Sequence, residues 1–211
     1  MIVDPKIERY LEKLLPAADS VQREMEHRAF VEDFPIVGAH VGRLLFILAR
    51  SMKARRILEL GSGYGYSALW FGRALPENGE VHLTDRSEEN LMSARRYLRR
   101  AGLLAKARFH HGDALSIIDR IKGRFDMVFN DIDKERYPEV VDKAVRILRP
   151  GGLLVTDNAL WKGNVHRTRV DAATRGVQKY NHRVFTHSQL QTVILPLRDG
   201  VAISLKQEQS D

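Results

Sequence analysis

The chain has 211 residues, enough for one domain with a single core, and 44% of them are apolar, which is usual for a globular protein. It contains no cysteine, which excludes disulfides and thiolate metal sites. The net charge of +7 keeps an anionic partner such as RNA among the candidates. No apolar run is long enough to span a membrane and the first residues are charged, so we expect no membrane association, no signal peptide and a cytoplasmic location.

Two polar helices are predicted at the start of the chain, within residues 4–32, and Pro16 separates them. We expect residues 1–34 to be a helical appendage that acts as a lid, as a dimer surface or as packing. The core is predicted to cover residues 35–211 and to start with a buried helix that ends near Ser51. We treat the whole of 1–211 as a single domain.

A short apolar strand over residues 56–60 runs into three glycines at alternate positions and then into a helical pattern. Strand, glycine turn and helix form the frame of a nucleotide-binding unit. The third glycine comes one residue too early for a dinucleotide site, and Glu59 would repel a pyrophosphate. S-adenosylmethionine, which carries an ammonium and a sulfonium, fits this acid better. The alternative is a tight turn that binds nothing.

The next two predicted strands each lead to an acid. A strand over 80–85 ends at Asp85, where nucleotide-binding folds place a carboxylate for the ribose hydroxyls. A charge at the start of the following helix, predicted for 87–101, is the other interpretation of this acid. Asp113 follows a strand over 107–111 and is suited to accept from an adenine amino group. The arginines at 95–100 are either a solvated helix face, which we favour, or an RNA-binding patch.

A helix over 115–121 and a strand over 125–131 follow, and the strand ends in Asp131. A Pro-Gly-Gly stop at 150–152 is predicted to end the next helix before a strand over 153–158. If these two strands are neighbours, Asp131, Asp157 and Asn158 converge, and three oxygen ligands suit a hard cation such as Mg²⁺. The alternative is that Asp157 and Asn158 only cap a turn.

A loop over 159–166, a helix over 168–182 and two strands over 191–197 and 201–206 complete the chain. Asp-Gly at 199–200 between alternating apolar runs is a strong hairpin signal. The predicted fold class is therefore α/β, with a Rossmann-like seven-stranded sheet that is mostly parallel, a C-terminal antiparallel hairpin and helices on both faces.

Three motifs carry a resemblance that spans about residues 33–207. They are Leu58–Gly61 with Gly65–Ser67, Asp131–Lys134 with Tyr137, and Asp157-Asn158 with Trp161 and Gly163. With them the chain resembles class I S-adenosylmethionine (SAM)-dependent methyltransferases, and within these the cation-dependent O-methyltransferases that act on catechols and caffeoyl-CoA. Asn130 departs from the apolar residue usual in that family, and the short chain leaves little room for the long substrate-binding insertion of the plant enzymes.

The resemblance implies a role for each matching residue. SAM would contact Val37, Glu59, Gly61, Gly63, Ser67, Asp85, Asp113, Ala114 and Asp131. A divalent cation, Mg²⁺ with Mn²⁺ and Ca²⁺ as alternatives, would bind Asp131, Asp157 and Asn158. Lys134 would be the general base beside Asp131, and Trp161 would form a wall of the acceptor site.

The function predicted on this basis is O-methylation of a small catechol-like or polyhydroxylated acceptor. A tRNA methyltransferase that acts on hydroxyuridine is the first alternative, and a SAM-binding protein without activity is the second. Family resemblance and the apolar stripe of the first helix also predict a homodimer formed through the N-terminal helices.

Overall fold

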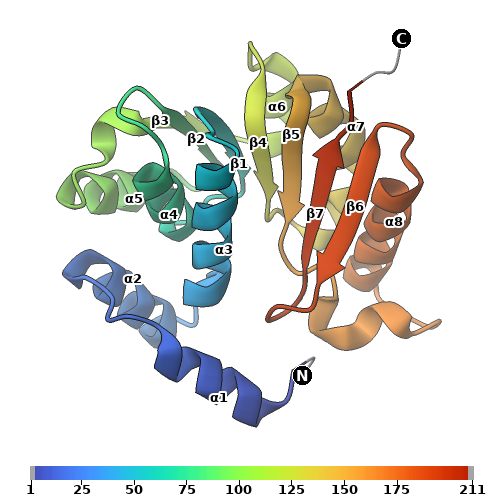
Figure 1. The fold of residues 1–211 in the computed structure, drawn as a ribbon, viewed down its shortest axis with the longest axis horizontal. Coiled ribbons are helices and arrows are strands. Elements are labelled where there is room, and N and C mark those ends of the chain that lie inside the picture. Colours follow the sequence, from blue (N-terminus) through green and yellow to red (C-terminus); the bar gives the residue numbers. More distant parts are fainter. Residues whose placement is uncertain (1–2, 209–211) are drawn as a thin grey trace.

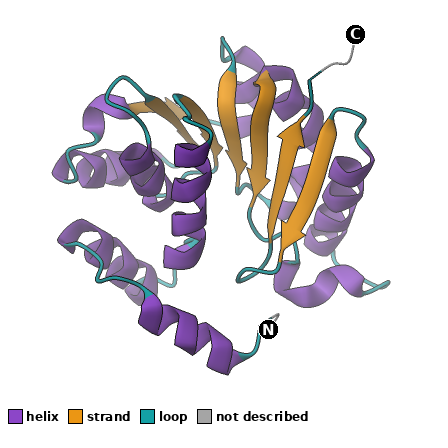
Figure 2. Ribbon diagram, viewed as in Figure 1, coloured by secondary structure: helices purple, strands orange, loops and turns teal. Residues whose placement is uncertain are grey.

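The computed structural model describes residues 3–208, which form a central seven-stranded sheet with helices on both faces (Figure 1; Figure 2). The strand order is β3-β2-β1-β4-β5-β7-β6. The first five strands are parallel, and β7 pairs antiparallel with both β5 and β6, which confirms the predicted fold class. The strands are β1 (Arg56–Leu60), β2 (Glu80–Asp85), β3 (Ala107–His111), β4 (Phe125–Asn130), β5 (Leu148–Thr156), β6 (Leu190–Leu195) and β7 (Val201–Lys206).

The two faces of the sheet belong to separate apolar clusters. Successive side chains of β1 alternate between them: Ile57 packs in the cluster with α3, α4 and α5, and Leu58 in the cluster with α6, α7 and α8. Both faces are covered, which explains why the central strands β1 and β4 are mainly apolar. The helices are α1 (Pro5–Leu14), α2 (Ser20–Val31), α3 (Gly38–Ser51), α4 (Tyr66–Ala74), α5 (Glu88–Arg100), α6 (Ala114–Arg120), α7 (Tyr137–Ile147) and α8 (Ala172–Thr186), with short 3₁₀ turns η1 (Leu104–Lys106), η2 (Lys134–Arg136) and η3 (Trp161–His166).

Two predicted elements have wrong boundaries: the start of one strand, and both the start and the end of the last helix, which ends at Thr186 instead of residue 182. The strand β5 begins at Leu148 instead of residue 153, because the Pro-Gly-Gly segment forms an irregularity in the pairing of β4 with β5 and not a separate turn. Helix α8 begins at Ala172 and not at residue 168. Its start is fixed by Asp171, whose carboxylate accepts a hydrogen bond from the Thr174 N–H at 2.7 Å.

Helix α1 lies at the edge of the molecule and buries none of its residues (Figure 1). Its apolar stripe is open to solvent: Ile7 is 52% exposed, and Tyr10 and Leu14 are each 61% exposed. That residues 1–34 act as an appendage stays a prediction, and residues 1–2 lie outside the described part. None of the helices within residues 3–208 has both the length and the apolar character needed to cross a bilayer.

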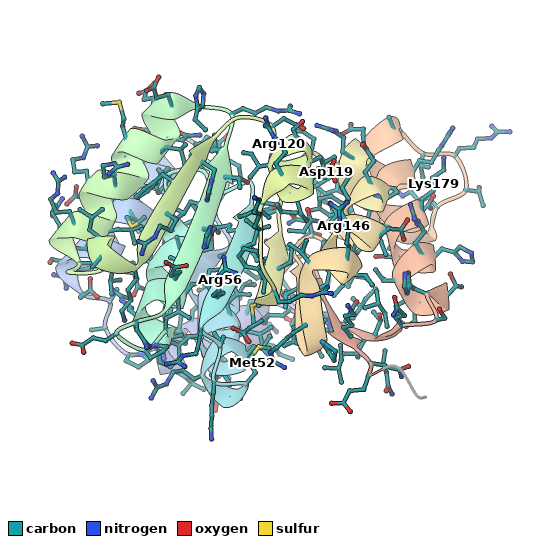
Figure 3. The ribbon with its side chains drawn as sticks, turned by 90° about the horizontal axis from the view of Figure 1, so that it is seen from above. Met52, Arg56, Asp119, Arg120, Arg146 and Lys179 are labelled. Atoms are coloured by element: carbon teal, nitrogen blue, oxygen red, sulfur yellow. The ribbon has the colours of Figure 1, made fainter. Side chains whose placement is uncertain are left out.

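Much of the positive charge lies away from the carboxyl ends of the strands. Figure 3 looks onto the opposite edge, where Arg56 starts β1 and where Arg120 and Arg146 lie at the ends of their helices. On α5, Arg100 forms an ion pair with Glu24 at 2.7 Å, and the Arg95 guanidinium lies 4.4 Å from the centre of the Phe109 ring. These contacts agree with the interpretation of α5 as a solvated and packing face.

Candidate functional site

A cavity of about 580 Å³ lies at the carboxyl ends of the parallel strands, where open α/β sheets bind ligands. The loops after β1, β3, β4 and β5, the segment before α3 and the β6–β7 hairpin all contribute to its wall. Every predicted site residue except Glu59 lines this cavity: Val37, Gly61, Gly63, Ser67, Asp85, Asp113, Ala114, Asp131, Lys134, Asp157, Asn158 and Trp161.

The glycine turn brings bare backbone to the cavity and to the neighbouring strand end. Gly61 has a φ angle of +80°, which residues other than glycine rarely adopt. A Cβ at this position would lie 2.5 Å from the carbonyl oxygen of Asp131. The Gly61 and Ser62 N–H groups donate to the Thr84 carbonyl at 3.2 and 2.9 Å. The turn therefore joins β1 to β2 and to the loop after β4.

Glu59 lies beneath the cavity floor, fully buried within β1. The Ser67 hydroxyl donates to its Oε1, whereas Oε2 has no hydrogen-bond partner among residues 3–208. Burial raises the pKa of Glu59 to about 8, against the hydrogen bonds from Ser67 and Ser62, and the carboxylates of Asp131 and Asp85 raise it further. In the ligand-free protein this acid is therefore mostly protonated at neutral pH.

This raised pKa predicts that Glu59 weakens the ligand-free fold as the pH rises. Between the unfolded pKa near 4.5 and about 8, the folded state holds one more proton, so stability decreases with increasing pH. Glu59→Gln, which still accepts from Ser67, removes this decrease, which amounts to on the order of 4 kcal/mol. Urea unfolding at pH 5, 7 and 8.5 tests this, with Glu77→Gln in an exposed turn as the control. Parallel pH curves for wild type and Glu59→Gln would contradict it.

Asp85 holds the glycine turn and the start of α5 together. Its Oδ2 accepts from the Gly63 N–H at 2.8 Å, and its Oδ1 accepts from the Ser87 N–H at 2.8 Å and from the Asn90 amide at 3.2 Å. Asp85 both lines the cavity and lies at the start of α5. Its position is therefore compatible with both interpretations, a ligand of the ribose hydroxyls and a charge at a helix start.

Asp113 caps α6 and accepts from two arginines that sequence reasoning did not select. Its Oδ1 lies 2.6 Å from Arg86 and 2.5 Å from Arg136, and its Oδ2 accepts from the Ser116 N–H at 3.0 Å. These contacts hold the pKa of Asp113 well below its usual range, and the hydrogen bond from Arg86 has the largest effect on it. Arg86 follows β2 and Arg136 ends η2, and neither belongs to one of the three motifs, so only the fold brings them to the cavity.

Asp131 and Asp157 come together as the predicted neighbouring strands require. Asn130 and Thr156 are paired in β4 and β5, so the two acids follow adjacent strand ends. Asp157 is only 5% exposed, and burial together with the Asp131 carboxylate raises its pKa. The Lys134 ammonium donates to Asp131 Oδ1 at 2.7 Å and to the Ile132 carbonyl at 3.3 Å. Two neighbouring carboxylates therefore face one lysine.

Asp199 connects the hairpin to the loop after β5, a role that the sequence did not indicate. It was interpreted only as a turn residue between β6 and β7. Its carboxylate accepts from the Asn158 side-chain amide at 3.3 Å and from the Lys162 N–H. Asp199 also lines the cavity, so the hairpin that completes the sheet contributes directly to the site.

Comparison with known proteins identifies relatives along most of the chain. A model of the O-methyltransferase family matches residues 18–207. The catechol O-methyltransferase of Niastella koreensis is 32% identical over 179 residues, covering 80% of this chain and 81% of that protein. Caffeoyl-CoA O-methyltransferase 1 of Eucalyptus globulus is 30% identical over 178 residues, covering 78% of this chain and 72% of that protein.

Solved structures give the same result. An O-methyltransferase of tomaymycin synthesis from Streptomyces achromogenes, in complex with SAM, has a TM-score of 0.87 and 31% identity and covers 96% of both chains. An O-methyltransferase from Bacillus cereus, in complex with SAH, has a TM-score of 0.86 and 26% identity and covers 96% of this chain and 97% of that one. The resemblance that the three motifs indicated is thus confirmed, and the chain belongs to the O-methyltransferase family.

Proposed function

We propose that this chain transfers the methyl group of SAM to a hydroxyl of a small catechol-like acceptor, with the help of a divalent cation. The observation that carries this proposal is the gathering of Asp131, Lys134, Asp157 and Asn158 at the cavity that the glycine turn also lines. Relatives named for catechol and caffeoyl-CoA as acceptors support it.

The cofactor half of the cavity suits SAM. Gly61 and Gly63 offer bare backbone for the methionine moiety beside Ser67, and Asp85 offers a carboxylate to the ribose. The space for the adenine is bordered by Asp113 and Ala114. The Asp113 carboxylate accepts hydrogen bonds from two guanidinium groups. The relatives solved with SAM and SAH support this assignment.

The donor set fits a divalent cation. Asp157 is buried beside the partly exposed Asp131 carboxylate. Lys134 forms an ion pair with Asp131, and Asp157 has no ion-pair partner among residues 3–208. Within residues 3–208 no three His, Cys, Asp or Glu side chains cluster as metal ligands, so the set would be two carboxylates and the Asn158 amide. Oxygen donors favour Mg²⁺, with Mn²⁺ and Ca²⁺ as alternatives. A bound dication would orient two vicinal acceptor oxygens and favour ionisation of the reacting hydroxyl.

The remaining steps fall to the side chains of this protein. The acceptor oxygen forms a bond to the methyl carbon while the carbon–sulfur bond breaks, which converts the sulfonium into a neutral thioether. Lys134, which lies at the acceptor end beside Asp131, would take the hydroxyl proton after losing its own. Trp161 would form an apolar wall for the aromatic ring of the acceptor.

A methyl-transfer assay with labelled SAM tests the proposal. A panel of catechols and bulk tRNA are compared with Mg²⁺ and with chelator. We expect label on a catechol that chelator abolishes. Label on tRNA alone would assign the hydroxyuridine alternative instead, and no transfer to any acceptor would favour a SAM-binding protein without activity.

The homodimer and the cytoplasmic location stay predictions. The solvent-exposed stripe of α1 supports a dimer through the N-terminal helices, because exposed apolar stripes favour contacts with a partner. Light scattering is expected to give twice the 24.1 kDa of the chain, and Ile7→Asp with Leu14→Asp is expected to halve this mass. Met92→Asp, an equally exposed apolar position on α5, is the control. A wild-type mass of one chain would exclude this dimer.

A further inference from the structure

The loop after β5 holds an unusual backbone at the cavity wall. Three residues of this loop have φ angles in the left-handed region that residues other than glycine rarely adopt. They are Asn158, Trp161 and Lys162, with φ values of +55°, +41° and +55°. Asp199 holds this conformation, because its carboxylate accepts from the Lys162 N–H and its carbonyl accepts from the Leu160 N–H at 2.9 Å. Backbone strain that the surroundings maintain in this way is typical of ligand sites.

An indole and an ammonium group from this loop lie beside a second ammonium group from η2. Trp161 and Lys162 both line the cavity, and the Lys162 ammonium lies 5.5 Å from the centre of the Trp161 ring. The Lys134 ammonium, which is predicted to act on the acceptor, lies 5.6 Å from the same ring. An aromatic acceptor that rests against Trp161 would therefore have a lysine at its reacting hydroxyl and a second lysine within reach.

Lys162 differs from the other cations of the cavity in having no carboxylate partner. Four lysines and arginines line the wall. Arg86 and Arg136 are ion-paired with Asp113, and Lys134 with Asp131. Across residues 3–208, no acid lies within ion-pairing distance of the Lys162 ammonium. The acceptor end thus presents one positive charge that the protein itself does not neutralise.

We propose that Lys162 selects acceptors that carry a carboxylate, so that the acceptor class is an aromatic acid with two vicinal hydroxyls. This inference rests on the proposed function and names its substrate class. The ring lies against Trp161, the hydroxyls face Asp131 and Asp157, and the carboxylate pairs with Lys162. The open position of Lys162 leaves this ion pair partly solvated, which limits its contribution.

The experiment compares 3,4-dihydroxybenzoate with its neutral amide, 3,4-dihydroxybenzamide. We expect wild type to prefer the acid, and we expect Lys162→Met to lower kcat/KM for the acid about fivefold through KM while leaving the amide unchanged. Lys162→Arg keeps the charge and is expected to retain most of the preference. Lys179→Met on the exposed side of α8 removes one charge far from the cavity and is the matched control (Figure 3).

The acid and the amide differ in the acidity of their phenol groups. Comparing the ratio of kcat/KM for acid and amide between wild type and variant removes this difference. An equal loss on acid and amide in Lys162→Met would overturn the inference, since Lys162 would then only support Trp161. Equal use of both acceptors by wild type, together with an unchanged ratio in Lys162→Met, would overturn it and leave the proposed function intact. Failure of wild type to methylate the acid, the amide or catechol would overturn both.

Discussion

Replacing Lys134 by alanine is expected to reduce the rate of methyl transfer by about 100-fold or more, because a positioned general base contributes about 10²–10⁴-fold. The side chain is held in place by Asp131 and the Ile132 carbonyl and lies 5.0 Å from the centre of the Tyr137 ring. Among the residues predicted to contact SAM, only Asp131 is hydrogen-bonded to Lys134, so SAM affinity is expected to stay within about twofold, an effect below 0.5 kcal/mol.

Single-turnover rates with a catechol and calorimetric binding of SAM measure the two quantities separately. A pH profile of the methyl-transfer rate distinguishes a general base from a structural lysine. As the pH increases, the wild-type rate is expected to reach a plateau. The Lys134→Ala rate is expected to keep increasing, because hydroxide then has to remove the proton. Lys143→Ala removes a lysine of α7 that pairs with Asp119 and serves as the control. Wild-type rates in Lys134→Ala would remove this residue from the mechanism.

Removal of divalent cations is expected to abolish most of the turnover, and Mg²⁺ or Mn²⁺ is expected to restore it. The physical reason is the buried Asp157 carboxylate, which lies beside the Asp131 carboxylate and has no ion-pair partner among residues 3–208. Asp157→Asn is expected to lower turnover about 100-fold or more and to weaken Mn²⁺ binding in calorimetry, since it removes one of two charged ligands. Asp119→Asn, a carboxylate at the opposite edge of the sheet, is the control (Figure 3).

The unfolding temperature separates loss of function from loss of fold. In chelator, the unfolding temperature of Asp157→Asn is expected to be no lower than that of wild type, because the substitution removes a buried carboxylate that lies beside the Asp131 carboxylate. Turnover that is indifferent to chelator in wild type would exclude the metal assignment, whatever the behaviour of the variant.

The order of the elements and most of the site were predictable because both depend on local patterns. Apolar runs that lead into acids mark β4 and β5, and the pairing of these two strands brings Asp131 and Asp157 together whatever their separation in sequence. The depth of Glu59 was not predictable, since it depends on the helices that cover β1. The role of Asp199 was not predictable either, because a turn signal gives no information on what the turn contacts.

The boundary errors have a similar cause. Pro-Gly-Gly is a local stop signal, yet pairing with β4 draws this segment into β5. The start of α8 depends on a single capping aspartate among several polar residues, so periodicity alone places it a turn too early.

The strand order has a consequence for how such enzymes diversify. The proposed cofactor side of the cavity comes from residues before about 115 and the proposed acceptor side from residues after about 130, and the two halves meet where β1 pairs with β4. Substitutions in the second half can therefore change which acceptor is bound, while the first half continues to be selected for binding the same cofactor. The close approach of Gly61 to the Asp131 carbonyl is a point where the halves cannot drift independently. Chimeras of related enzymes are best joined between α6 and β4, with this contact kept from a single parent.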